Sequence, residues 1–186
     1  MSQSHATTKK LCTLGLLCAI SIVLVCFVHF PLFPAASFLE YDPADIPIFL
    51  GTFLFGPIAG LLLTIVTSII QGLTVSASSG FIGIIMHILA TGSFVVVFGL
   101  ITRKNKNIKR SIIALIAGII TMTAVMMLCN LIFTPIFMGT PVDAVLQMML
   151  PIILPFNLIK AIINGVVAFL LSKSLHMALK NYFDFA

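Results

Sequence analysis

Apolar residues form long unbroken runs along this chain. Four of the runs contain 18 or more residues, at positions 11–28, 81–101, 111–133 and 152–171. At 1.5 Å per residue, a helix of that length crosses about 30 Å of hydrocarbon. A membrane β-barrel would instead show apolar and polar residues in alternation. The pattern therefore predicts a bundle of membrane-spanning α-helices.

The stretch at residues 46–70 has two interpretations. It is apolar enough to form one span, but "FGPIAG" places Gly56 and Pro57 together near its middle, where a helix is expected to break. The alternative is two short helices that turn back at this point. Neither is long enough to cross the membrane, and a broken backbone at that depth must be covered by protein.

The basic residues decide between these interpretations. The loop "TRKNKNIKR" at residues 102–110 carries five Lys or Arg, and Lys9 and Lys10 precede the first apolar run. A single span at 46–70 would put the loop and the N-terminus on opposite sides of the membrane, against the positive-inside tendency. A break at Gly56-Pro57 places both on the cytoplasmic side, so we favour the break.

The result is an all-α integral membrane protein of six helices, with short second and third helices and both termini cytoplasmic. We expect one membrane domain over residues 1–186, with helices at about 11–29, 45–55, 57–72, 80–102, 110–134 and 152–178. The connections expected on the outer side are residues 30–45, 74–80 and 134–150.

Composition supports a membrane environment. The 186 residues are 60% hydrophobic and 8% charged, and the mean hydropathy is +1.23; a soluble domain needs a more polar exterior. The net charge of +5 comes from basic residues at the ends of apolar runs, which indicates membrane topology and no nucleic-acid partner. The four cysteines lie within apolar runs without a C-x-x-C pair, so we interpret them as packing residues.

The segment "LPFNLIKAIINGVV" places a lysine inside the last apolar run. Asn157, Lys160 and Asn164 follow at spacings of three and four residues, so they share one face of a helix. A charge in hydrocarbon costs about 2.5–3.5 kcal/mol on insertion scales and should face the bundle interior with a partner. Glu40 is the expected partner, because it directly follows an apolar run. A purely structural ion pair, or a lysine that reaches the interface, is the alternative.

Two asparagines beside that lysine favour a ligand pocket, to which Asn130 of the fifth helix would add a further amide. Since one cation reaches the outer half, a multiply anionic ligand is poorly matched. The surrounding apolar residues favour a flat body. The predicted ligand is a neutral, partly aromatic small molecule that carries hydroxyl or amide groups and enters from outside.

Other chemistry has weaker support. His29 and His87 lie in the outer half and would allow a haem between two helices, although single histidines are more often structural. The chain has no G-x-x-x-x-G-K-[ST], H-E-x-x-H or G-x-S-x-G motif. We therefore expect no enzyme, no metal site and no bound cofactor.

The first helix carries Gly15 and Ala19 four residues apart. Small residues at this spacing allow another helix to approach closely. The same spacing also serves packing within a bundle, so it does not by itself identify a docking surface.

Three segments together resemble the riboflavin-specific S components of energy-coupling factor (ECF) vitamin transporters. They are "FLEYDPADIPIFLGTFLFGPIAG", "MHILATGSFVVVFGLI" and "LPFNLIKAIINGVV". The resemblance implies a six-helix subunit of a prokaryotic cell membrane that binds riboflavin from outside. It also implies a partnership with a membrane coupling subunit and two cytoplasmic ATPases.

The resemblance also suggests roles for individual residues. Gly15 and Ala19 stand where S components carry an A-x-x-x-A docking motif, a departure in residue but not in size. The residues expected to bind the substrate are Leu39, Glu40, Tyr41, Asn130, Asn157, Lys160 and Asn164. Another vitamin or a flavin nucleotide remains an alternative ligand, although the absence of Trp argues against thiamin.

Overall fold

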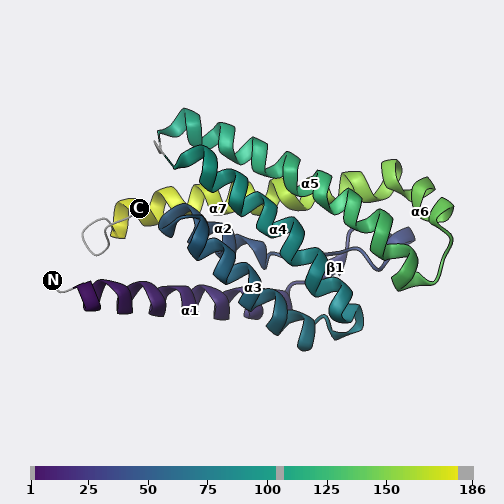
Figure 1. The fold of residues 1–186 in the computed structure, drawn as a ribbon, viewed down its shortest axis with the longest axis horizontal. Helices are drawn as coiled ribbons and strands as arrows, with labels where there is room; N and C mark the ends of the chain where they lie inside the picture. Colours follow the sequence, from purple (N-terminus) through teal and green to yellow (C-terminus); the bar gives the residue numbers. More distant parts are fainter. Residues whose placement is uncertain (1–2, 104–106, 180–186) are drawn as a thin grey trace.

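The chain folds as an elongated bundle of helices (Figure 1). The computed structural model describes residues 3–103 and 107–179. The long helices are α1 (Gln3–Phe27), α2 (Asp45–Phe55), α3 (Pro57–Leu73), α4 (Gly80–Thr102), α5 (Ile108–Met138) and α7 (Leu154–Leu179). The short elements are β1 (Phe30–Pro31), η1 (Pro34–Ala36), β2 (Glu40–Tyr41), η2 (Ala77–Ser79), α6 (Val142–Met148) and η3 (Met149–Ile153). Since α6, η3 and α7 follow one another without a gap, the predicted six-helix architecture is confirmed.

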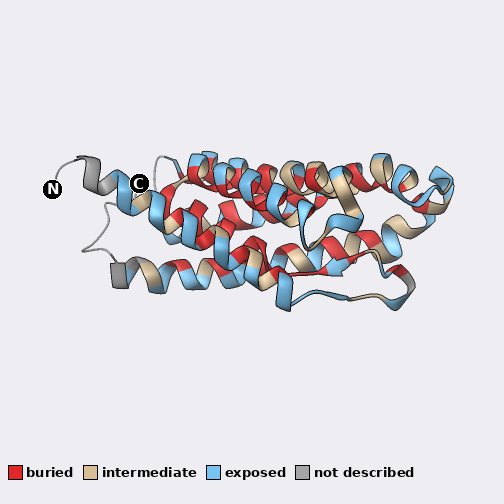
Figure 2. Cartoon of the chain, turned by 90° about the horizontal axis from the view of Figure 1, so that it is seen from below, coloured by how far each residue is buried: buried red, intermediate tan, exposed pale blue. Residues whose placement is uncertain are grey.

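Among the residues that the structure describes, four helical segments are long and apolar enough to cross a membrane. They are Thr7–Phe27, Ala77–Thr102, Ile108–Met138 and Val142–Leu175. The beginning of α1 and the end of α7 lie at the same end of the bundle (Figure 1). Buried residues line the inner faces of the helices, whereas the outer faces are exposed (Figure 2). These outer faces carry large apolar side chains such as Leu100 and Ile113, which suits contact with lipid.

The break between α2 and α3 occurs at Gly56, as predicted. Gly56 has a φ of +88°, a conformation that favours glycine. Pro57 is the first residue of α3, where a backbone N–H has no acceptor within the helix, so proline loses no hydrogen bond there. Ten of the eleven residues of α2 are buried, because α1, α3 and α7 pack around it. The interrupted backbone is therefore covered by protein.

Phenylalanine rings fill the core toward the end of the bundle that holds the termini. Phe49 of α2 stacks on Phe94 of α4 with ring centroids 3.9 Å apart. One turn further, Phe53 and Phe98 lie at 4.2 Å. This aromatic packing joins α2 to α4 and leaves the polar residues for the opposite end.

The prediction of a non-helical connection at residues 134–150 is wrong for most of its length. Helix α5 continues through Pro135 to Met138 and ends at Gly139, whose φ is +62°. Residues Val142–Met148 form α6, and a π-helical turn containing Pro151 connects it to α7. Proline is a weaker helix terminator in a membrane bundle than in a soluble protein, because neighbouring groups and local π adjustments satisfy the backbone.

Gly99 provides a test of the contact between α3 and α4. A Cβ added there would overlap the ring of Pro57 and lie 2.6 Å from its Cγ, and both groups are held by their helices. We expect Gly99→Ala to lower the free energy of unfolding by about 1–3 kcal/mol, the usual effect of overpacking. The measurement is thermal unfolding of the purified protein in detergent.

The matched control is Gly15→Ala on α1, where an added Cβ would meet nothing within 4 Å. It should leave stability unchanged or raise it slightly through helix propensity. Equal effects of the two substitutions would contradict the close approach at Gly99.

Candidate ligand-binding site

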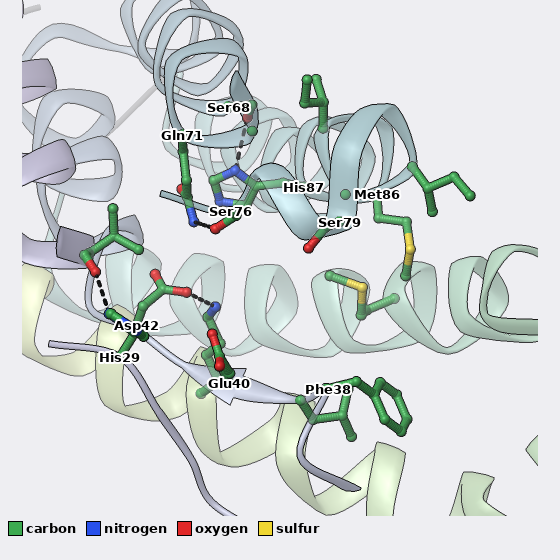
Figure 3. Close-up of a pocket in the computed structure, with 18 of the residues that line it drawn as sticks. His29, Phe38, Glu40, Asp42, Ser68, Gln71, Ser76, Ser79, Met86 and His87 are labelled. Atoms are coloured by element: carbon green, nitrogen blue, oxygen red, sulfur yellow. Dashed lines mark hydrogen bonds and ion pairs between the residues drawn. The ribbon is translucent and has the colours of Figure 1, made fainter. Parts of the chain in front are cut away.

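A cavity of about 200 Å³ lies at the end of the bundle where α1 ends and α7 begins. Helices α3, α4, α5 and α7 and the loop after α1 enclose it. Figure 3 shows Gln71, Ser76 and His87 above the cavity, with Glu40 and Phe38 of the loop below it. The sequence-predicted residues that line it are Leu39, Glu40, Asn130, Asn157 and Lys160.

Lys160 forms its ion pair with Asp42, and the predicted pairing with Glu40 is wrong. The Lys160 ammonium lies 2.7 Å from Asp42 Oδ2, and both side chains line the cavity. Asp42 Oδ1 accepts a hydrogen bond from the Ala44 backbone N–H at 3.0 Å, a local turn that directs the carboxylate inward. Glu40 lies in β2 opposite Pro31 and stays exposed. The position of Glu40 directly after an apolar run therefore predicted the wrong partner for Lys160, whereas the turn at Asp42 explains the observed one.

Tyr41 and Asn164 lie behind the cavity wall. The buried Tyr41 hydroxyl donates to Asn164 Oδ1 at 3.0 Å, and Asn164 Nδ2 donates to the Asp42 carbonyl at 3.0 Å. Burial raises the pKa of the Tyr41 phenol, so it remains a donor at neutral pH. These two residues connect the loop to α7 and hold Asp42 beside Lys160.

Two asparagines place amide groups on the cavity wall. Asn157 Nδ2 donates to the Ile153 carbonyl at 2.8 Å, and Asn130 Nδ2 donates to the Met126 carbonyl at 2.9 Å. Thr134 donates to Asn130 Oδ1 at 2.9 Å. Within residues 3–103 and 107–179, no side chain donates to Asn157 Oδ1. Asn157 therefore offers an acceptor to a ligand next to the Lys160 ammonium.

The opposite wall of the cavity, on α3 and α4, contains a polar network that sequence reasoning missed. His87 Nε2 lies 2.9 Å from Oδ1 of the fully buried Asp45, and Thr91 donates to the same oxygen at 2.8 Å. His87 Nδ1 lies 2.8 Å from Ser68 Oγ. The sequence signal was the spacing of His87 and Thr91, four residues apart on α4, opposite an acid in the first turn of α2.

This network argues against a haem bound by His87 and against nucleophilic catalysis at Ser68. Both ring nitrogens of His87 have partners, so haem iron would have to displace Asp45 or Ser68. Asp45, His87 and Ser68 resemble the order of a nucleophilic triad, but Ser68 is buried within α3. Within α3 the backbone N–H groups donate to carbonyl groups of the helix, so they do not form an oxyanion hole.

The small residues Gly15 and Ala19 of α1 do not line the cavity. Gly15 and Ala19 are both exposed, and the space beside Gly15 is open. They are available for contact with another helix, which keeps their docking role as a proposal.

The pairing of Lys160 with Asp42 predicts different stabilities for two neutralising substitutions. Asp42→Asn should lower the free energy of unfolding by about 3 kcal/mol, because it leaves a largely buried ammonium without its counter-charge. Glu40→Gln should change it by less than about 0.5 kcal/mol, since Glu40 is exposed. Thermal unfolding in detergent without ligand measures both. A larger loss for Glu40→Gln would restore Glu40 as the partner.

Comparison with known proteins gives one consistent family. The family described as "ECF transporter, substrate-specific component" matches residues 9–172. A Staphylococcus aureus protein named riboflavin transporter RibU is 30% identical over 92% of this chain and 93% of its own length. The Bacillus subtilis riboflavin transporter FmnP is 26% identical over 86% of this chain and 87% of its own.

The fold agrees with a solved structure of the S component of a bacterial ECF transporter. The TM-score is 0.80 at 32% identity, over 94% of this chain and 99% of the other. The matched segment includes the loop that carries Asp42 and the part of α7 that carries Lys160. This chain therefore belongs to the family of substrate-specific components of ECF transporters.

Proposed function

We propose that this chain is the riboflavin-binding subunit of an ECF-type importer. The observation that carries the proposal is the Lys160–Asp42 ion pair in the wall of the cavity, next to the amides of Asn130 and Asn157. The curated relatives described above are named as riboflavin transporters, which supports riboflavin as the ligand.

The cavity has the chemistry that riboflavin requires. One edge of the flavin ring presents two carbonyl acceptors around an imide N–H donor, which match the Lys160 ammonium and an asparagine side chain. The ring faces suit apolar lining residues such as Leu39 and Phe156. The cavity is smaller than the roughly 300–1,000 Å³ of typical small-molecule sites, so flexible residues such as Met126 would move aside as the ligand enters.

The proposed orientation places the cavity on the outer side of a prokaryotic cell membrane. Three exposed lysines lie near helix ends: Lys9 near the start of α1, Lys109 at the start of α5 and Lys173 near the end of α7. These parts of the three helices lie at the end of the bundle that holds the termini (Figure 1). The positive-inside tendency makes that end cytoplasmic. The chain would act as one multi-pass membrane domain over residues 1–186. A membrane coupling subunit would bind the face of α1 that carries Gly15 and Ala19, and two cytoplasmic ATPases would drive transport.

A binding measurement on the purified protein tests the proposal. We expect flavin absorbance in protein purified in detergent, and quenching of riboflavin fluorescence when the ligand is added to protein from which flavin was removed. A competition panel of FMN, thiamin and other vitamins separates riboflavin from the alternative cargoes. Protein that neither carries flavin nor quenches riboflavin would contradict the proposal, and preferential displacement by another vitamin would redirect it.

Lys160→Ala should weaken riboflavin binding by about 1–3 kcal/mol, because the flavin loses a hydrogen-bonding partner in a buried site. Isothermal titration or fluorescence quenching gives the affinity. A double variant, Lys160→Met with Asp42→Asn, removes both charges and should recover stability without recovering affinity. Wild-type affinity in the double variant would show that the ion pair is structural.

Gly15→Leu and Ala19→Leu should leave riboflavin binding unchanged and impair uptake into cells, because a bulky side chain prevents close approach of the coupling subunit to α1. Ala124→Leu, at an exposed position of α5, is the matched control and should leave both properties unchanged. Normal uptake with both α1 variants would remove this face as the docking surface.

A further inference from the structure

A second cavity, of about 390 Å³, lies at the end of the bundle that holds the termini. The C-terminal parts of α2, α4 and α7 and the first turn of α5 form its walls, and these parts lie at the same end in Figure 1. The cavity beside Lys160 lies at the opposite end of the bundle. Riboflavin binding, as proposed above, therefore does not involve the second cavity.

The inner part of this second cavity is aromatic. Phe53 of α2 and Phe98 of α4 are buried, with ring centroids 4.2 Å apart, and Phe169 of α7 lies edge-on to Phe53 at 6.1 Å. The hydroxyls of Thr102 and Ser172 donate to carbonyl groups of their own helices, at 2.8 and 2.7 Å. Because these hydrogens are already used, the inner part of the cavity is a poor site for water and suits an apolar group.

The rim of the second cavity is cationic. Lys173 of α7 lines it, and its ammonium lies 5.0 Å from the centroid of the Phe169 ring. The side chain is otherwise exposed. Within residues 3–103 and 107–179, the ion pairs are Lys160–Asp42 and His87–Asp45, so no carboxylate of that part of the chain pairs with Lys173. Lys173 is therefore available to an anion at the edge of the cavity.

Charge is distributed unequally between the two ends of the bundle. The carboxylates of the described residues lie in the loop before α2 and in the first turns of α2 and α6: Glu40, Asp42, Asp45 and Asp143. The basic residues at the end that holds the termini are Lys9, Lys10, Arg103, Lys109, Arg110 and Lys173. This end therefore attracts anions. The positive-inside tendency places it in the cytoplasmic leaflet, whose surface is negative because of its anionic lipids.

We propose that the second cavity binds an anionic phospholipid, with one acyl chain against the three phenylalanine rings and the phosphate on Lys173. The lining extends along α7 from Phe169 to Met177, about 12 Å of helix, so an acyl chain can lie along it while the head group stays at the membrane surface. A free phosphate would leave the aromatic part unfilled, and an uncharged lipid would leave Lys173 without an anion. Because four helices form the walls, a bound lipid connects them and stabilises this end of the bundle.

Thermal unfolding of delipidated protein in a neutral detergent, with lipid added back, tests the proposal. Phosphatidylglycerol should raise the Tm by about 3–6 °C at saturation, since a ligand that binds only the folded state stabilises it. Phosphatidylcholine with the same acyl chains should raise it less, and inorganic phosphate should leave it unchanged. Native mass spectrometry should show one phosphatidylglycerol retained on each chain. Neither measurement uses riboflavin, so a failure here is distinct from a failure of the proposed transport function.

Two pairs of variants test the two parts of the cavity. Ser172→Leu fills the inner part and should abolish the Tm shift, whereas Ser174→Leu, at an exposed position that does not line the cavity, should retain it. Lys173→Gln should respond equally to the two lipids, whereas Lys109→Gln, also exposed and outside the lining, should keep the wild-type preference. Since Lys173 is exposed, its replacement tests the inference even if Ser172→Leu does not fold.

Equal Tm shifts by the two lipids in the wild-type protein would overturn the inference, as would the same behaviour of both members of either pair of folded variants. A chain that ends after Leu179 should bind phosphatidylglycerol as the full chain does. Binding that appears only in this shorter chain would also overturn the inference, because residues 180–186 and not a lipid would then occupy the cavity.

Discussion

The need to neutralise a charge in an apolar bundle determines how the binding end of this protein is built. Lys160 enters the bundle on α7, and the carboxylate that accompanies it comes from the loop after α1, 118 residues earlier. Because an unpaired ammonium at this depth is costly, the loop must lie against α7. The Tyr41–Asn164 hydrogen bond strengthens the same contact. The ion pair thereby forms part of the cavity wall and also fixes the loop that closes it.

The interruption at Gly56 has a related consequence. The break allows α2 to be short and covered by α1, α3 and α7, so that Asp45 at its first turn is buried against α4. Since α3 then runs back beside α4, Ser68 and His87 meet at the cavity. The backbone break and the polar network are therefore parts of one arrangement.

The features that were predictable from the sequence are those set by local pattern. Apolar run length and the distribution of basic residues were sufficient for the six helices and the break at Gly56, and helical spacing placed Asn157 and Lys160 on the cavity face. The partner of Lys160 depended on a turn at Asp42. Glu40 and Asp42 are two residues apart, and the sequence pattern does not indicate which of the two carboxylates points inward. The Asp45–His87 contact depended on the packing of α2 against α4, which periodicity does not report.

A permanent counter-ion also determines which ligands this site can favour. A neutral ligand cannot replace Asp42, so the ion pair has to remain intact when the ligand is bound. An ammonium has three N–H donors, and the described residues accept one of them, through Asp42 Oδ2. Two donors remain for carbonyl oxygens of a ligand. The ion pair therefore suits a ligand that presents uncharged carbonyl oxygens to Lys160.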